Sequence, residues 1–145
     1  MSLTEDFLNP DEEKEVVHAI SLAEKNTSGE IRVHIEAHTE KPPLERAKEV
    51  FHQLGMDKTE AKNGVLFYVG VKDHSFAIIG DKGIDDLVEE DFWDCTKDVV
   101  IEHFKNKQFK TGLVEGILRA GDRLKKYFPY QDDDANELSN EISKG

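Results

Sequence analysis

The chain has 145 residues and a formal net charge of −12, from 31 acidic and 19 basic side chains. This length suffices for one domain with its own core, while the acidic excess disfavours binding to nucleic acid or to an anionic membrane surface, which both require Lys and Arg. With Cys95 as its single cysteine, the chain has neither an internal disulfide nor a cysteine-based zinc site.

The first predicted element is an amphipathic helix that begins after Asn9. Asn9 suits the N-cap position, Pro10 suits the first helical position, and Glu12 is placed to complete a capping box. Apolar residues then recur at helical spacing, at Val16, Val17, Ile20 and Ala23. The segment 26–29 ends this helix.

Strands and helices then alternate along the chain. Residues 30–37 alternate between apolar and polar side chains, which predicts a strand with one polar face. Pro42-Pro43 begins a second helix that runs to about residue 54, with Gly55 just beyond its end. Residues 65–71 are continuously apolar, as in a strand buried on both faces. With 76–79 they form a β-hairpin.

Two more helices are predicted in the second half. The third begins at Asp85 or Asp86 and directs apolar residues inward, namely Val88, Phe92, Cys95, Val99 and Phe104. The fourth covers about residues 109–127. Gly112 and Gly116 form a small-residue ridge on it, and because helix glycines cost about 1 kcal/mol each, we expect close packing against a neighbour.

The order of these elements predicts the fold class. Helix, strand, helix, strand, strand, helix, helix indicates a three-layer α/β/α sandwich, with a small mixed sheet of three or four strands flanked by about four helices. We assign residues 1–130 to a single domain and residues 131–145 to an acidic C-terminal tail. No run approaches 18 apolar residues and the N-terminus lacks the features of a signal peptide, so we expect a soluble cytoplasmic protein without membrane insertion.

Three loops should meet at one edge of this sheet. Residues 30–37, 43–54 and 65–71 form a βαβ unit, so the two strands run parallel, and the hairpin makes 76–79 antiparallel to them. The starts of the first two strands and the end of the third therefore lie together. Their residues are Ser28, Gly29 and Glu30, then Asn63 and Gly64, and then Gly80, Asp81, Lys82 and Gly83.

Carboxylates at this edge suggest a site for a hard cation. Ca²⁺ takes about six to eight oxygen ligands in irregular geometry, from carboxylates, backbone carbonyls and waters. We therefore predict a metal site formed by Glu30, Asp81, Asp85 and Asp86 and lined by the three loops. In the alternative interpretation, Asp85 and Asp86 only cap a helix and Glu30 only pairs with Lys62.

Other patterns are weaker. His34 and Glu36 share one face of the predicted strand and could ligate a metal, although a His34 that packs under a helix or faces water is the simpler interpretation. The P-loop, EF-hand and H-E-x-x-H motifs are absent. Ser28 and Cys95 lack the surroundings of a nucleophile, so the sequence identifies no catalytic residue.

Three segments, in this order and spacing, resemble the TPM domain family: residues Ser28 to Val33, Asn63 to Val69, and Phe76 to Ile84. Four further segments resemble the small bacterial stand-alone branch of that family: Phe92-Trp93, Phe109 to Leu113, Phe128-Pro129 and Asn136-Glu137-Leu138. The resemblance covers about residues 4–142. It implies an α/β/α sandwich, in agreement with the order of the elements.

The resemblance also implies candidate functions. Some members of the family bind calcium, which makes calcium the expected cofactor, with Glu30 and Asp81 in matching motifs and no organic cofactor. Three hypotheses remain open. The first is a calcium-binding domain, and the second is an interaction module that binds a protein partner through Trp93, the helix faces and the segment 136–138. The third is a metal-assisted acid phosphatase, an activity attributed to plant members.

Overall fold

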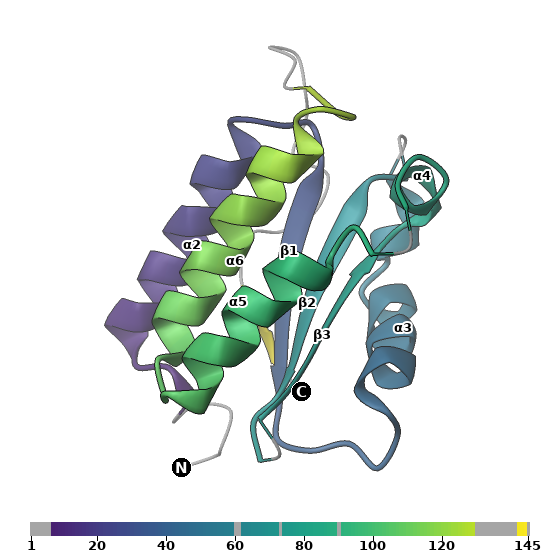
Figure 1. Ribbon diagram of the computed structural model, residues 1–145. Coiled ribbons are helices and arrows are strands. Elements are labelled where there is room, and N and C mark those ends of the chain that lie inside the picture. The colour runs from purple at the N-terminus through teal and green to yellow at the C-terminus, as the bar shows by residue number, and fades with distance from the viewer. Residues whose placement is uncertain (1–6, 60–61, 73, 90, 130–141, 145) are drawn as a thin grey trace.

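The computed structural model describes residues 7–59, 62–72, 74–89, 91–129 and 142–144. Its elements are α2 (Pro10–Glu24), β1 (Glu30–Glu36), α3 (Pro43–Gln53), the 3₁₀ helix η1 (Met56–Lys58), β2 (Gly64–Gly70), β3 (Ser75–Gly80), α4 (Lys82–Asp85), α5 (Asp94–Lys105), α6 (Phe109–Leu124) and β4 (Ser143–Lys144). In Figure 1, α2, α5 and α6 cover one face of the sheet and α3 covers the other. This arrangement confirms the predicted α/β/α sandwich.

The N-terminal helix begins as the sequence predicts. The Asn9 side chain accepts a hydrogen bond from the Glu12 backbone N–H at 2.8 Å, and the Glu12 carboxylate accepts one from the Asn9 backbone N–H at 3.0 Å. These two bonds satisfy backbone donors that the first turn of a helix otherwise leaves unpaired. The capping box is therefore confirmed.

The sheet is mixed, with strand order β3-β2-β1-β4. β1 pairs parallel with β2, and β2 pairs antiparallel with β3, as the crossover and hairpin arguments predict. The fourth strand, β4, pairs parallel with the outer side of β1 and places Ser143 opposite His34. It comes from residues 131–145, the segment that we assigned to the C-terminal tail. Most of that segment, residues 131–141, lies outside the described residues.

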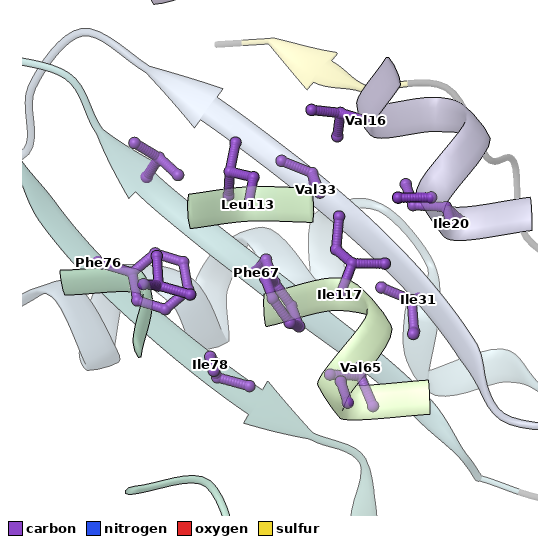
Figure 2. Packing of buried hydrophobic residues seen from close by; sticks show 14 of the residues in the cluster. Val16, Ile20, Ile31, Val33, Val65, Phe67, Phe76, Ile78, Leu113 and Ile117 are labelled. Atoms are coloured by element: carbon purple, nitrogen blue, oxygen red, sulfur yellow. The ribbon is translucent and has the colours of Figure 1, made fainter. Parts of the chain in front are cut away.

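The two faces of the sheet pack against different helices. Toward α2, α5 and α6, alternate strand residues such as Ile31, Val33 and Phe67 are completely buried, and Figure 2 shows Leu113 and Ile117 lying over them. On the other face, Leu66 and Tyr68 pack against α3 and Met56 in a second, smaller core. Because β2 has helices on both faces, its whole length is buried, as its apolar run predicts.

The predicted third helix is two helices. Asp81, and not Asp85 or Asp86, is the N-cap of α4, which ends after four residues, and the chain turns before α5 begins at Asp94. The apolar residues from Val88 to Phe104 therefore do not lie on the one continuous helix that their spacing predicted. As a result Cys95 is exposed, and its predicted place in the core is wrong. Thr96, Val100 and Phe104 form the buried face of α5 instead.

Helix α6 approaches α5 through its glycines, as predicted. A Cβ atom on Gly116 would lie 2.5 Å from Val100 Cγ2, and one on Gly112 would lie 2.9 Å from His103 Cβ. Both distances are shorter than any ordinary contact, so only glycine permits this separation of the two helices. Across the described ranges, no helix combines the length and apolar character needed to cross a membrane.

Candidate functional site

The three predicted loops do meet at one edge of the sheet. The Glu30 backbone N–H donates to the Asn63 carbonyl at 3.1 Å, and the Asp81 N–H donates to the Gly64 carbonyl at 2.8 Å. The Asn63 side-chain amide donates to the Ser28 carbonyl at 3.0 Å. Asn63 is thus the residue that ties the first loop to the second.

Two of the predicted ligands lie in one row across the strands. Glu30 is opposite Gly64 in the β1–β2 ladder, and Gly64 in turn bonds to Asp81. The carboxylates of Glu30 and Asp81 therefore come from either side of Gly64, a residue without a side chain. Glu30 is only 4% exposed, and Asp81 is partly buried.

The other two predicted ligands follow Asp81 along α4. One oxygen of the Asp81 carboxylate, Oδ1, accepts from the Lys82 backbone N–H at 2.7 Å and so caps this short helix. The other oxygen, Oδ2, is buried and has no hydrogen-bond partner among the described residues. Asp85 is the last residue of α4 and Asp86 is its C-cap.

The charges of these carboxylates act on one another. Partial desolvation raises the pKa of the Asp85 carboxyl, and the negative charges of Asp86 and Asp81 raise it further, while Lys48 opposes them. The end of β3 therefore carries an excess of negative charge.

The remaining loop residues have structural contacts. A Cβ on Gly29 would meet Leu124 Cδ1 at 3.1 Å, and one on Gly80 would meet Ile84 at 3.3 Å, so a side chain at either position would crowd its neighbour. Lys82 and Gly83 form the first turn of α4. The ammonium group of Lys62 donates to the carbonyl of Asp57.

These residues do not form a preformed metal cage. Nowhere in the described part of the chain do three or more His, Cys, Asp or Glu side chains lie close enough together to hold a metal ion. The backbone brings the loops together, but Gly64 separates Glu30 from Asp81. A cation at this edge would therefore need carbonyl oxygens and waters for much of its coordination shell.

A groove of about 640 Å³ lies beside the same carboxylates. It follows the outer strand β3, with α3 on one side and the beginning of α5 on the other. Its apolar lining includes Leu44, Phe51, Phe76, Ile78 and Trp93, and its charged lining includes Lys48, Asp81, Asp85, Asp94 and Lys97.

A buried polar network at the opposite end of β1 was not predicted. The Glu36 carboxylate accepts hydrogen bonds from Arg46 Nε at 2.9 Å, Arg46 Nη2 at 3.0 Å, His34 Nε2 at 3.0 Å and the Tyr68 hydroxyl. Burial alone would raise the pKa of Glu36, but the bonds from Arg46, Tyr68 and His34 outweigh it and lower the pKa to about 2. Glu36 is therefore ionised at neutral pH.

The ionised Glu36 fixes the tautomer of His34. Because this carboxylate can only accept, His34 Nε2 carries the proton, and Nδ1 accepts from the Ser143 hydroxyl at 2.9 Å. Burial lowers the pKa of His34, although the hydrogen bond to Glu36 opposes the shift. Both ring nitrogens are occupied, so the network acts as a tie between α3, β1, β2 and β4 rather than as a set of open ligands. The only sign of this network in the sequence was the position of His34 and Glu36 on one face of the predicted strand.

Comparisons with known proteins agree with this architecture. A family model described as the TPM domain matches residues 2–123. The chain is 56% identical to the BA42 protein from the psychrophilic bacterium Bizionia argentinensis, with a TM-score of 0.92 over 97% of each chain. No curated protein matches the chain.

Two more distant structures share the fold. One is the N-terminal domain of a protein from P. gingivalis, at 18% identity and a TM-score of 0.69, over 84% of this chain and 79% of that one. The other is the N-terminal domain of the cg2496 protein from Corynebacterium glutamicum, at 9% identity and a TM-score of 0.64, over 95% and 80%.

Proposed function

The chain belongs to the TPM domain family, and from this premise we propose that it binds a divalent cation, with Ca²⁺ as the expected ion, where β3 ends. The proposed ligands are Asp81, Asp85 and Asp86, with Glu30 reaching the ion from the other side of Gly64. The observation that supports the proposal best is the Asp81 Oδ2 atom, which is buried and has no hydrogen-bond partner among the described residues. A buried carboxylate oxygen without a partner is costly, and a cation would compensate it.

The charges around α4 support the same proposal. Desolvation and then the carboxylates of Asp86 and Asp81 raise the pKa of Asp85, and a bound cation would neutralise the part that is repulsion between carboxylates. Oxygen donors from carboxylates and loop carbonyls are the ligands that Ca²⁺ prefers. Because few carboxylates converge, we expect a water-rich site of modest affinity.

Calcium binding should stabilise the folded protein. A ligand present at about ten times its Kd adds about 1.4 kcal/mol to the free energy of unfolding, which for a domain of this size raises the melting temperature by about 4 °C. Thermal unfolding with increasing CaCl₂, and in parallel with MgCl₂, measures this shift. We expect Asp85→Asn to abolish it.

The matched control is Asp98→Asn, which removes one exposed carboxylate of the acidic helix α5 and has the same effect on net charge. This variant should keep the calcium-dependent shift. If Asp98→Asn reduces the shift as much as Asp85→Asn does, calcium acts only by screening the overall negative charge, and the proposed site is wrong.

Phosphatase activity is tested with the same samples. Metal-assisted hydrolysis needs a cation that polarises a phosphoryl oxygen and activates a water, so turnover of a phosphomonoester should fall strongly in Asp85→Asn. Equal turnover by the wild type and this variant would assign the activity to a contaminant.

A further inference from the structure

Strand β3 is an edge of the sheet, and no strand in the described part of the chain pairs with its outer side. In an antiparallel ladder, every second residue forms hydrogen bonds with the neighbouring strand. The Asp81 N–H donates to Gly64, so Ile79, Ala77 and Ser75 are the residues of β3 that bond to β2. The residues between them, Phe76, Ile78 and Gly80, therefore direct their backbone N–H and C=O groups away from β2. No other described residue forms a hydrogen bond with these groups.

In Figure 1, β3 runs between α3 and α5. Residues of these three elements line the groove, so the outer side of β3 lies along it. The groove is lined along its length by β3 itself, from Phe76 to Asp81. Leu44, on the α3 side, is 51% exposed, so its side chain is open to a ligand in the groove. A volume of about 640 Å³ is that of an ordinary ligand site.

Two side chains of the groove carry polar atoms without a partner. Trp93 Nε1 is a hydrogen-bond donor, Asp81 Oδ2 is an acceptor, and both are buried and unbonded in the described structure. Together with the outward backbone groups of β3, they give the groove both hydrogen-bond donors and acceptors. A polypeptide backbone is the ligand that offers both kinds of group at matching intervals.

The charges of the groove indicate how such a ligand would lie. Asp81 and Asp85 follow β3 directly, so its Gly80 end is rich in carboxylate. Lys48 and Lys97 also line the groove. An added strand antiparallel to β3, the slightly more stable pairing, places its N-terminal residue at the Gly80 end. A basic side chain there would be attracted to the carboxylates.

We propose that the β3 groove binds an extended segment of a partner protein as an added strand. The segment pairs antiparallel with Phe76, Ile78 and Gly80, lays apolar side chains against Leu44 and Trp93, and places a Lys or Arg near Asp81 and Asp85. A divalent cation bound to Asp81 and Asp85 would compete with this basic side chain, so we test the peptide in the presence of a chelator.

The probe is an acetylated hexapeptide with an N-terminal lysine followed by alternating valine and threonine. Trp93 is the only tryptophan of the chain, so its fluorescence reports binding at the groove, and amide chemical shifts locate it. We expect saturable fluorescence changes and shifts centred on 76–80. The same peptide N-methylated on the nitrogens that face β3 should bind at least about tenfold more weakly, because it cannot form the backbone hydrogen bonds.

A charge reversal provides the matched test in the protein. Asp85→Lys should weaken the lysine peptide several-fold and strengthen a peptide with glutamate in that position, while Asp98→Lys on α5 should change neither. Equal affinity of the N-methylated peptide, or shifts outside β3 and its flanking helices, would overturn the proposal. Concentration-dependent shifts of the β3 amides without any peptide would also overturn it, by assigning this edge to a second copy of the chain.

Discussion

Arg46 holds two carboxylates in contrasting environments. Glu36, whose side chain is 6% exposed, accepts two hydrogen bonds from the guanidinium, whereas Glu49, 37% exposed, lies 3.4 Å from Nη1 and also pairs with Lys41. A buried carboxylate that loses its charge leaves its partners uncompensated, while an exposed pair exchanges its contacts for water. The two glutamates are therefore a natural matched pair.

Replacing Glu36 should cost far more stability than replacing Glu49. We expect Glu36→Gln to lower the free energy of unfolding by about 3 kcal/mol, and Glu49→Gln to lower it by less than about 1 kcal/mol. Urea unfolding of the two variants and the wild type measures the difference. Similar losses in both variants would mean that the network around Glu36 contributes no more than a surface ion pair.

The same carboxylate should make stability depend on pH. The folded pKa of Glu36 is about 2, below its ordinary value of 4.5, so the unfolded chain takes up the proton first as the pH falls. The contribution of Glu36, roughly 3 kcal/mol, is thus fully present above about pH 5 and is lost toward pH 2. In urea unfolding at a series of pH values, the gap between the wild type and Glu36→Gln should close over this range. A constant gap would contradict the lowered pKa.

At the scale of elements, the contact between α5 and α6 depends on a missing side chain. A methyl group on Gly116 would meet Val100 Cγ2 at 2.5 Å and Phe67 Cε2 at 3.1 Å. Alanine favours the helix by about 1 kcal/mol, but overpacking a core costs about 1 to 3 kcal/mol. The crowding should prevail, because Val100 and Phe67 are completely buried and have no free space to move into.

Gly116→Ala should therefore destabilise the protein despite its better helix propensity. Val100→Ala alone should also destabilise it, by leaving a cavity. The double variant should lose less stability than the sum of the two single losses, since the added methyl group fills part of the removed volume. Thermal unfolding of the four proteins measures this coupling. Strictly additive losses would show that the two side chains do not share this space.

The elements that the sequence predicts well are specified by residues close together in the chain. The capping box at Asn9 and Glu12, the left-handed Gly55 after α3, and the β2–β3 hairpin each depend on a few neighbouring positions. The meeting of the three loops was also predictable, because the handedness of a crossover is nearly invariant.

The parts that were missed depend on distant contacts. β4 has two residues and pairs with a strand more than 100 positions earlier, so no local period marks it. The hydrogen bonds from Arg46 to Glu36 depend on the rotation of α3 about its own axis relative to the sheet. The apolar residues of α3 define that rotation only approximately. Cys95 was assigned to the core because no residue type signals the turn that separates α4 from α5.

At the scale of the whole molecule, the two sides of the sheet differ in how their outer strands are paired. Among the described strands, β3 has no partner on its outer side, which lies beside a groove, whereas the outer side of β1 is paired with β4. β4 is held further by the Ser143 hydroxyl on His34 and by the ion pair of Lys144 with Glu13 on α2. The C-terminal strand thus joins the sheet to the N-terminal helix.

Deleting residues 142–145 should expose the outer side of β1. We expect faster hydrogen exchange of the β1 amides that face β4 and a loss of about 1 to 2 kcal/mol in stability. Ser143→Ala, which keeps the backbone pairing, should lose no more than about 1 kcal/mol and keep these amides protected. Identical exchange in the deletion and the wild type would show that β4 does not protect this edge.

The exposed position of Cys95 gives this chain a built-in point of attachment for a probe. It is the only thiol in the sequence, it is open to solvent, and it is two residues from Trp93 at the start of α5. A maleimide dye or nitroxide would therefore yield a single product, next in the chain to the groove residue Asp94, without any engineered residue. The unmodified protein can thus be labelled to follow events at that groove by distance-dependent quenching or by paramagnetic relaxation.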